Sequence, residues 1–345
     1  MASEQSLLQL LQSRSIVDCD TMDVEVAKSL GPFVDCTSNQ AIAYFELLKP
    51  VHKARIEKVI RMAQIPTASL TISTTELAVE MAMVSLQLEI SRHITGLVHV
   101  QTNPYYAYDS HKTVDNARRI VKLFQILDPN FDRTRVCVKI PSTWEGLQAC
   151  RILKDMDIKT LATTLFTIEQ ASLAGEVGCH YIAPYVNELK VHFDASFIDN
   201  NKAQKLCITA QHLYQTNDMK TQVLPASLTS VAEIMELAGV DHITIAPGLL
   251  QQLADTSASS NTTVSLFDAK VSAEPVPKFV SFANDESKYR MAFTRSNGGN
   301  GEGEKKLVQA INIFCDMQDK LEDIMGQLLK NGDSETQATI SEANH

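Results

Sequence analysis

The sequence predicts an α/β protein in which eight parallel strands close into a (β/α)8 barrel (the TIM-barrel architecture), followed by an additional C-terminal helix. Short runs rich in β-branched residues recur along the chain, and longer helical patterns separate them. Eight is the number of strands that closes a barrel whose interior is filled by side chains. The chain has 345 residues, and barrels of comparable size fold as one unit. We therefore expect a single domain over residues 1–330.

The strands are predicted from short apolar segments that end at polar or turn-forming residues. They cover residues 16–20, 33–37, 96–101, 136–140, 159–163, 180–183, 222–226 and 242–245. Apolar residues at helical spacing predict helices over 75–92, 111–127 and 201–214. A further helix is predicted over 142–153, because Ser142 is followed three positions later by Glu145, as in a capping box.

The C-terminal part of the chain predicts a last helix over residues 304–329, beyond the eighth strand. The polar, Gly- and Ser-rich stretches 256–263 and 296–304 predict mobile connections, and residues 331–345 predict a disordered tail. The last helix has two open placements, on its own barrel or on a neighbouring copy in a homodimer.

Composition excludes several classes of function. A formal net charge of −10 argues against a nucleic-acid partner, which requires a basic surface. No apolar run approaches the roughly 18 residues that span a bilayer, and the first residues lack a signal-peptide pattern. We therefore expect a cytoplasmic protein without a membrane partner. The seven scattered cysteines and nine histidines show no metal-binding spacing, so we expect no metal and no disulfide framework.

The segment RVCVKIPSTWEG, residues 135–146, contains the main candidate for chemistry. Alternation along a strand places Cys137 and Lys139 on one face, and Lys139 lies near the carboxyl end of that strand. Catalytic residues of parallel barrels collect at this end. Burial disfavours the charged ammonium, and a neutral lysine attacks carbonyl groups. The alternative is an ordinary strand-end lysine whose charged end reaches solvent.

The motif KIPSTWEG resembles the active-lysine motif of the transaldolase family, K-[IL]-A-S-T-W-x-G. Asp20, in DCDTMD, is similar to the aspartate of the family's first strand, and Asn39, in DCTSN, to the asparagine of its D-A-T-T-N motif. The segments TLFTIEQASLAGEVGCHYIAPYV and LAGVDHITIAPGLLQQL resemble later strands of the family, so the likeness runs from about residue 16 to residue 330.

The resemblance implies an enzyme that acts on small-molecule ketoses and aldehydes through a Schiff base. It implies no cofactor, because the lysine itself supplies the electron sink. Lys139 would form an imine with the ketose carbonyl, and Asp20 would take the proton from the hydroxyl beside the scissile bond. Asn39 and Ser227 would hold the remaining three-carbon unit, and Thr163 keeps the family's threonine. Without the resemblance, Asp20 and Asn39 are read more readily as loop-capping residues.

Two departures from the family pattern concern the fate of the three-carbon unit. Gln101 replaces the glutamate that works on a catalytic water, and Tyr185 replaces the phenylalanine of S-P-F. An amide orients water but does not exchange a proton with it near neutrality, whereas a phenol donates and accepts hydrogen bonds. Both residues resemble the fructose-6-phosphate aldolase branch, in which dihydroxyacetone is released. The alternative is a neutral change at Gln101 and a core aromatic at Tyr185.

Two further departures concern the substrate phosphate. Glu188 and Thr229 stand where the family has arginines that hold the phosphate. A carboxylate close to a phosphate is unfavourable wherever water is scarce. Lys190 and His192 are candidate replacement cations. We therefore expect an unusual, less phosphate-dependent substrate.

Three functions remain open from the sequence. The first is an aldolase or transaldolase with altered substrate choice. The second is an ordinary pentose-phosphate transaldolase acting on sedoheptulose 7-phosphate and glyceraldehyde 3-phosphate. The third is a catalytically inactive barrel with a binding role, against which the retention of Lys139, Asp20 and Asn39 counts.

Overall fold

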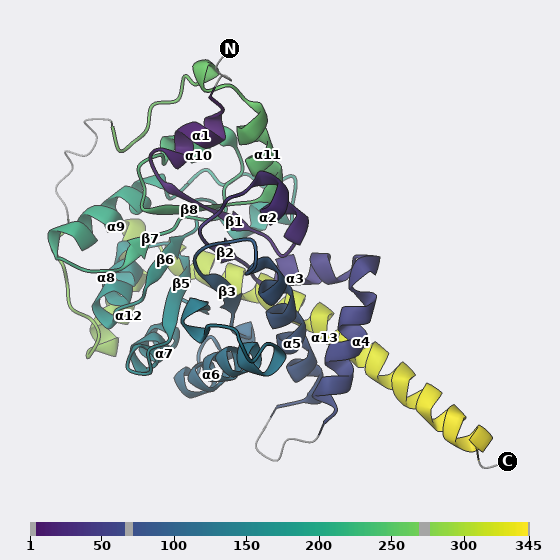
Figure 1. Cartoon of the computed structure of the whole chain (residues 1–345). Coiled ribbons are helices and arrows are strands. Elements are labelled where there is room, and N and C mark those ends of the chain that lie inside the picture. The colour runs from purple at the N-terminus through teal and green to yellow at the C-terminus, as the bar shows by residue number, and fades with distance from the viewer. Residues whose placement is uncertain (1–4, 66–71, 269–276, 344–345) are drawn as a thin grey trace.

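The eight strands form one parallel sheet in the order β7-β6-β5-β4-β3-β2-β1-β8. The computed structural model describes residues 5–65, 72–268 and 277–343, with side chains described as far as residue 330. The sheet curls into a nearly closed barrel, and helices surround it (Figure 1). The predicted (β/α)8 barrel with additional C-terminal structure is confirmed.

Every predicted strand has a counterpart in the structure, and the first and last have the predicted bounds. The strands are β1 (Ile16–Asp20), β2 (Cys36–Thr37), β3 (Val98–Gln101), β4 (Val136–Pro141), β5 (Lys159–Leu165), β6 (Tyr181–Pro184), β7 (Gln222–Val223) and β8 (His242–Ile245).

Strands β2 and β7 are shorter than predicted because side chains and a proline interrupt their backbone ladders. The backbone N–H of Asp35 donates to the Asp18 carboxylate (2.8 Å), and the Asp35 carboxylate accepts from the N–H of Leu97 (2.7 Å). Beyond β7, Pro225 has no N–H to donate, and its carbonyl accepts from Thr244 N (3.3 Å). These bonds and the single bridge between Tyr185 and Ala226 continue the barrel where regular pairing stops.

The helices alternate with the strands and cover the outside of the barrel. They are α1 (Leu7–Gln12), α2 (Val24–Leu30), α3 (Gln40–Leu47), α4 (Lys53–Ala63), α5 (Thr74–Ile90), α6 (Ser110–Leu127), α7 (Trp144–Lys154), α8 (Ile168–Val177), α9 (Gln204–Thr216), α10 (Val231–Glu236), α11 (Pro247–Asp255), α12 (Glu286–Gly299) and α13 (Glu302–Ala343). Short 3-10 turns include η1 (Pro50–His52), η2 (Pro104–Tyr106), η3 (Arg133–Arg135), η4 (Leu189–His192) and η5 (Ala258–Ser260).

The capping box predicted at Ser142 is wrong by one residue. Thr143 is the N-cap of α7, and its side chain accepts from the N–H of Gly146 (2.8 Å). Ser142 instead joins two strands, because its N–H and its hydroxyl both donate to the carbonyl of Thr163. The motif after Lys139 therefore anchors the end of β4 to β5 before the helix begins.

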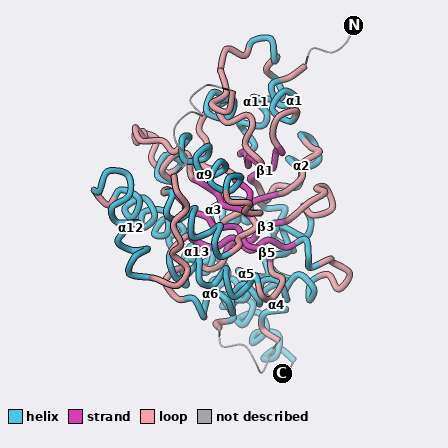
Figure 2. The backbone as a smooth tube through the Cα atoms, turned by 90° about the vertical axis from the view of Figure 1, so that its left-hand side faces the viewer, coloured by secondary structure: helices cyan, strands magenta, loops and turns pink. Residues whose placement is uncertain are grey.

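The last helix is longer than expected and lies against its own barrel. Helix α13 contacts α3, α5, α12 and η4, and continues through most of the segment predicted as a disordered tail. It crosses one end of the barrel and then projects beyond α4 (Figure 1). Figure 2 shows the strands at the centre of the molecule with helices around them. Residues 344–345 lie outside the described residues.

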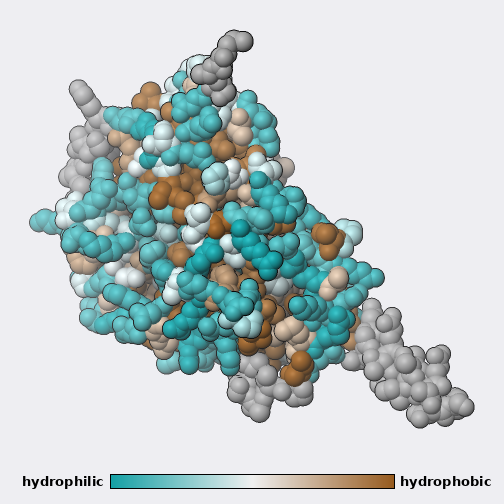
Figure 3. Space-filling model, viewed as in Figure 1, coloured by the Kyte–Doolittle hydropathy of each residue, from teal (hydrophilic) through white to brown (hydrophobic). Residues whose placement is uncertain are grey.

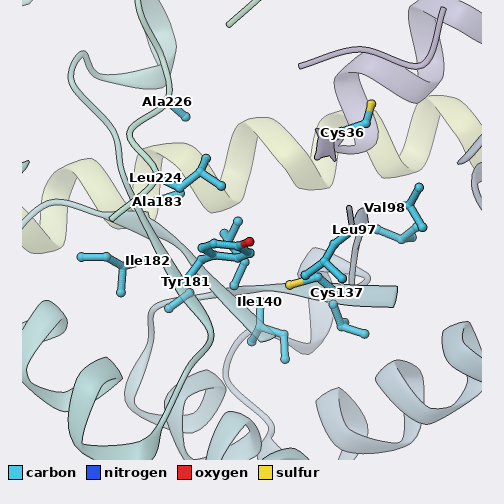
Figure 4. Close-up of a cluster of buried hydrophobic side chains, with 14 of the residues drawn as sticks. Cys36, Leu97, Val98, Cys137, Ile140, Tyr181, Ile182, Ala183, Leu224 and Ala226 are labelled. Carbon is cyan, nitrogen blue, oxygen red and sulfur yellow. The ribbon is translucent and has the colours of Figure 1, made fainter. Parts of the chain in front are cut away.

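A continuous apolar core fills the barrel and the layer between strands and helices. Tyr181, Cys137 and Leu224 belong to this core (Figure 4). The face of the molecule shown in Figure 3 is mainly hydrophilic. Among the described residues, none of the helices has both the length and the apolar character that crossing a bilayer requires.

Candidate active site

A cavity of about 510 Å³ opens at the carboxyl end of the barrel strands. Six of its polar lining residues come from strand ends and the loops that follow them: Asp20, Asn39, Lys139, Tyr185, Ser227 and Thr244. The remaining wall comes from helices and loops above the barrel, including α3, η4 and α13. Nine residues were predicted for the site, and five of them line this cavity. The volume of the cavity suits a small-molecule substrate.

Lys139 lies on β4, where its Cα is paired with Gln101 on one side and with Leu161 on the other. Only 2% of its surface is exposed, although its side chain lines the cavity. The Nζ atom lies 6.0 Å from the centre of the Tyr185 ring. The alternative of a lysine that reaches bulk solvent does not fit this burial, and an amine so placed is accessible mainly to a ligand in the cavity.

Asp20, the last residue of β1, is held by a chain of hydroxyl groups. Thr37 Oγ1 donates to Asp20 Oδ1 (2.6 Å), and the Thr37 and Thr244 hydroxyl oxygens are also 2.6 Å apart. Since Thr37 has one hydroxyl proton and donates it to the carboxylate, Thr244 is the donor to Thr37. This chain fixes one carboxylate oxygen of Asp20 while the residue still lines the cavity.

Asn39 and Ser227 lie on the β2–α3 and β7–α10 connections. Asn39 caps α3, its Oδ1 accepting from the N–H of Ile42 (3.0 Å), so its amide nitrogen remains available as a donor. Ser227 has a backbone φ of +59°, which is uncommon for a residue other than glycine and typical of functional loops. Its hydroxyl lies 2.9 Å from His192 Nε2. Desolvation lowers the pKa of His192, opposed by the charges of Asp20 and Glu233.

Gln101, Tyr185 and Thr163 lie around the lysine. Tyr185 is 3% exposed, and its hydroxyl accepts from Thr163 Oγ1 at 3.2 Å. Gln101 is 2% exposed, and neither its Oε1 nor its Nε2 has a hydrogen-bond partner. Buried amides are normally satisfied by protein or water. The unpartnered Gln101 amide therefore has its two N–H donors and its carbonyl acceptor free for a bound water. Gln101 and Thr163 are not among the residues that line the cavity.

Glu188 and Thr229 lie outside the cavity. The Glu188 carboxylate accepts from Gln309 Nε2 (2.9 Å) and lies 3.8 Å from Lys306 Nζ, both on α13. Thr229 donates its N–H and its hydroxyl to Glu233 (2.8 and 2.9 Å). Glu188 therefore does not point its charge at a bound ligand, contrary to the expectation from sequence. Lys190 is also engaged elsewhere, 3.4 Å from Asp194.

Several lining residues were not singled out from sequence. Thr244 lines the cavity, and Thr37 lies behind it and donates to Asp20. Both could have been found, because they lie at the ends of strands, two residues from His242 and Asn39. Phe314, on α13, could not, because nothing in the sequence places the last helix beside the barrel mouth.

One buried cluster has the residue types of a metal site. Candidate ligand atoms of Asp18, Asp35 and His242 lie within 4.8 Å of one another. However, Asp18 and His242 are hydrogen-bonded to each other (2.8 Å), and the Asp35 carboxylate is bonded to His99 (2.9 Å) and Leu97 N. These oxygens and nitrogens are therefore already used within the barrel.

Comparison with known proteins identifies the family. The model of the family "Transaldolase/Fructose-6-phosphate aldolase" matches residues 17–296. The chain belongs to this family. It is an aldolase-type enzyme in fold and in ancestry. The transaldolase of Schizosaccharomyces pombe is 30% identical over 293 residues, which cover 84% of this chain and 89% of the relative. The transaldolases of Alteromonas mediterranea and Shewanella frigidimarina are each 28% identical, covering 91% of this chain and 96% of the relative.

Proposed function

We propose that this transaldolase-family protein cleaves and forms carbon–carbon bonds through a Schiff base on Lys139, handling a dihydroxyacetone-type three-carbon unit. The observation that carries the proposal is the buried Lys139 amine in the same cavity as the anchored Asp20 carboxylate. A neutral amine supplies the nucleophile, and a fixed carboxylate supplies the base.

The residues perform the cleavage in a defined order. Lys139 Nζ adds to the ketose carbonyl, water leaves, and a protonated imine forms. Asp20 then accepts the proton of the hydroxyl beside the scissile bond. That carbon–carbon bond breaks, its electron pair moves toward the imine nitrogen, and an aldehyde leaves. The three-carbon unit remains on Lys139 as an enamine, with Asn39 and Ser227 within the same cavity to hold its hydroxyl groups.

Gln101 and Tyr185 favour release of this unit over its storage. The unpartnered Gln101 amide can hold a water, and the Tyr185 hydroxyl, which accepts from Thr163, can donate its own proton. Protonation of the enamine carbon followed by attack of water on the imine would free dihydroxyacetone and restore the amine. The third possibility, an inactive barrel, is disfavoured because it has no need for a buried lysine that lines the same cavity as a carboxylate.

A second candidate is transfer of the unit between sugar phosphates, as in an ordinary transaldolase. The relatives are named transaldolases, which supports this second candidate. The cavity supports it less, because no arginine is among the described residues that line it.

The test is reductive trapping. The protein is incubated with dihydroxyacetone, fructose or fructose 6-phosphate, reduced with borohydride, and the intact chain and its peptides are weighed. We expect an adduct on the peptide that holds Lys139 and its loss in Lys139→Ala. Lys190→Ala, at a partly exposed lysine outside the cavity lining, is the matched control and should keep the adduct. An adduct on another lysine, or none with any ketose, would refute the proposal.

The fate of the trapped unit separates the two candidates. If dihydroxyacetone accumulates from fructose without any added aldehyde, release is the reaction. If cleavage proceeds only when an acceptor aldehyde is present, transfer is the reaction.

A further inference from the structure

The cavity above Lys139 has two chemically different parts. Its polar part comes from strand ends and is deeply buried, with Lys139 2% and Tyr185 3% exposed. Its outer wall includes Phe45, Phe193 and Phe314, of which the first two are 56% and 39% exposed and lie at the rim. The exposure therefore increases from the lysine toward an aromatic entrance.

Three separate elements contribute to this aromatic entrance. Phe45 is on α3, Phe193 follows η4, and Phe314 is on α13, where it is fully buried. Leu189 and Ile42 also line the cavity. Such a surface gains free energy by removing apolar groups from water, and its aromatic rings suit flat or branched apolar groups.

The charged groups of the rim are already paired with one another. Lys49 Nζ lies 2.6 Å from Asp23 and 2.8 Å from Glu46, and Glu46 also accepts from His52 (2.7 Å). Lys49 together with two carboxylates leaves a local excess of negative charge. A phosphate placed there would meet these carboxylates as well as the lysine, which is unfavourable.

His192 does not compensate for this negative charge. Desolvation lowers the pKa of its imidazole, and its Nε2 already lies 2.9 Å from the Ser227 hydroxyl. The described residues that line the outer wall thus provide apolar contact and no free cation for an anion.

We infer that the outer wall binds the apolar substituent of an unphosphorylated aldehyde, either as the acceptor in carbon–carbon bond formation or as the aldehyde released on cleavage. This inference rests on the proposed Schiff-base function and names its substrate class. The nucleophile is the enamine of dihydroxyacetone on Lys139. Its carbon bonds to the aldehyde carbon, the aldehyde oxygen takes a proton, and water then hydrolyses the imine. The product is a ketose with an aromatic or branched aliphatic end.

The test compares three aldehydes with dihydroxyacetone as the common donor: phenylacetaldehyde, glycolaldehyde and glyceraldehyde 3-phosphate. We expect kcat/KM for phenylacetaldehyde to exceed that for glyceraldehyde 3-phosphate at least about tenfold, because apolar pockets discriminate by this order of magnitude. A preference of the same size for glyceraldehyde 3-phosphate would overturn the inference.

Variants at the rim locate the effect. In Phe45→Ser, we expect the loss of kcat/KM for phenylacetaldehyde to be about tenfold larger than the loss for glycolaldehyde. Phe193→Ser should act in the same direction. Val51→Ser is the control, because Val51 is 78% exposed but does not line the cavity. Equal losses for both aldehydes in Phe45→Ser, or the same selective loss in Val51→Ser, would contradict the assignment.

Borohydride trapping with dihydroxyacetone alone separates this inference from the function on which it rests. An adduct on Lys139 combined with the reversed aldehyde preference would overturn only the substrate class. Absence of the adduct would overturn the Schiff-base function itself.

Discussion

At the scale of single residues, an unusual feature is the pair of aspartate–histidine contacts inside the barrel below Lys139. Asp18 bonds His242 (2.8 Å) and Asp35 bonds His99 (2.9 Å), and all four residues are at most 3% exposed. The same carboxylates accept backbone N–H groups that the strand ladder leaves unpaired. The two carboxylates therefore replace hydrogen bonds that a neighbouring strand would otherwise provide, because buried backbone N–H groups require acceptors.

The position of Gly96 follows from the same carboxylate. A Cβ atom at Gly96 would lie 2.1 Å from Asp35 Oδ1, so no larger residue fits while Asp35 reaches the N–H of Leu97. The sequence contains this glycine, but only the position of Asp35 explains it.

Substitution of His242 should reveal a pH-dependent contribution to stability. Desolvation lowers the pKa of His242, but its hydrogen bond to Asp18 and the charge of Asp18 outweigh this and raise it. A raised pKa gives stability that is complete below the unfolded-state value of about 6.5 and is lost as pH rises through the folded-state value. The excess free energy of unfolding of wild type over His242→Gln should therefore be largest near pH 6 and narrow above it, by at most about 1.4 kcal/mol per pH unit.

Urea unfolding between pH 5 and pH 9 measures this difference. His111→Gln, at an exposed position, controls for the loss of an imidazole as such. A gap between wild type and His242→Gln that widens with rising pH would contradict the assigned direction of the shift.

At the scale of elements, a buried lysine on α13 forms a hydrogen bond and ion pairs with the loops of the barrel. Lys306 Nζ donates to the carbonyl of Asn201 (2.8 Å) and lies 3.3 Å from Asp199, 3.4 Å from Glu302 and 3.8 Å from Glu188. The side chain of Lys306 is 6% exposed. Glu188 departs from the family pattern, and its negative charge is neutralised by Lys306 on α13.

Lys306→Met should destabilise the protein, because it leaves the Asp199 and Glu188 carboxylates buried without their cation. The expected loss in the free energy of unfolding is about 3–5 kcal/mol, as for the removal of one partner of a buried ion pair. Lys305→Met changes an exposed neighbour on the same helix and should have little effect. Chemical denaturation measures both variants, and equal stabilities would show that the cluster does not hold α13.

The elements also show what could be predicted from the sequence. Strands β1 and β8 were predicted with their observed bounds because β-branched alternation and polar ends coincide there. The predicted β2 is too long because the aspartate contacts that replace its ladder are visible only in three dimensions. The predicted β7 is too long because it includes Pro225, although a proline without an N–H already marks the end of regular pairing in the sequence. Lys139 and Asp20 could be named because they lie in local motifs that resemble those of a known family. The wall above them could not, because it is built from segments that are far apart in the sequence.

At the scale of the whole molecule, the net charge of the protein and the charges at the cavity rim both disfavour the binding of anions. The chain carries a formal net charge of −10, and the lysine at the cavity rim is already bound to two carboxylates. A negative protein repels anions over distances that salt shortens. Phosphorylated substrates therefore gain little from long-range attraction and meet paired charges on arrival.

We predict that fructose 6-phosphate is less than tenfold better than fructose in kcat/KM, which corresponds to less than about 1.4 kcal/mol. We also expect kcat/KM for the phosphorylated sugar to rise with ionic strength relative to that for fructose, because salt screens the repulsion. Steady-state assays at low and high salt test both points. A preference of tenfold or more that weakens with salt would instead indicate a cationic phosphate site.

The crossing of α13 over the barrel mouth has a consequence for biosynthesis. Domains generally fold as units while the chain is being made. Lys139 and Asp20 precede Phe314 in the chain, yet Phe314 is fully buried in the wall of the same cavity. Until α13 has been made, a barrel that already contains Lys139 lacks this part of its cavity wall. The cavity can therefore be complete only after the ribosome has released the residues of α13.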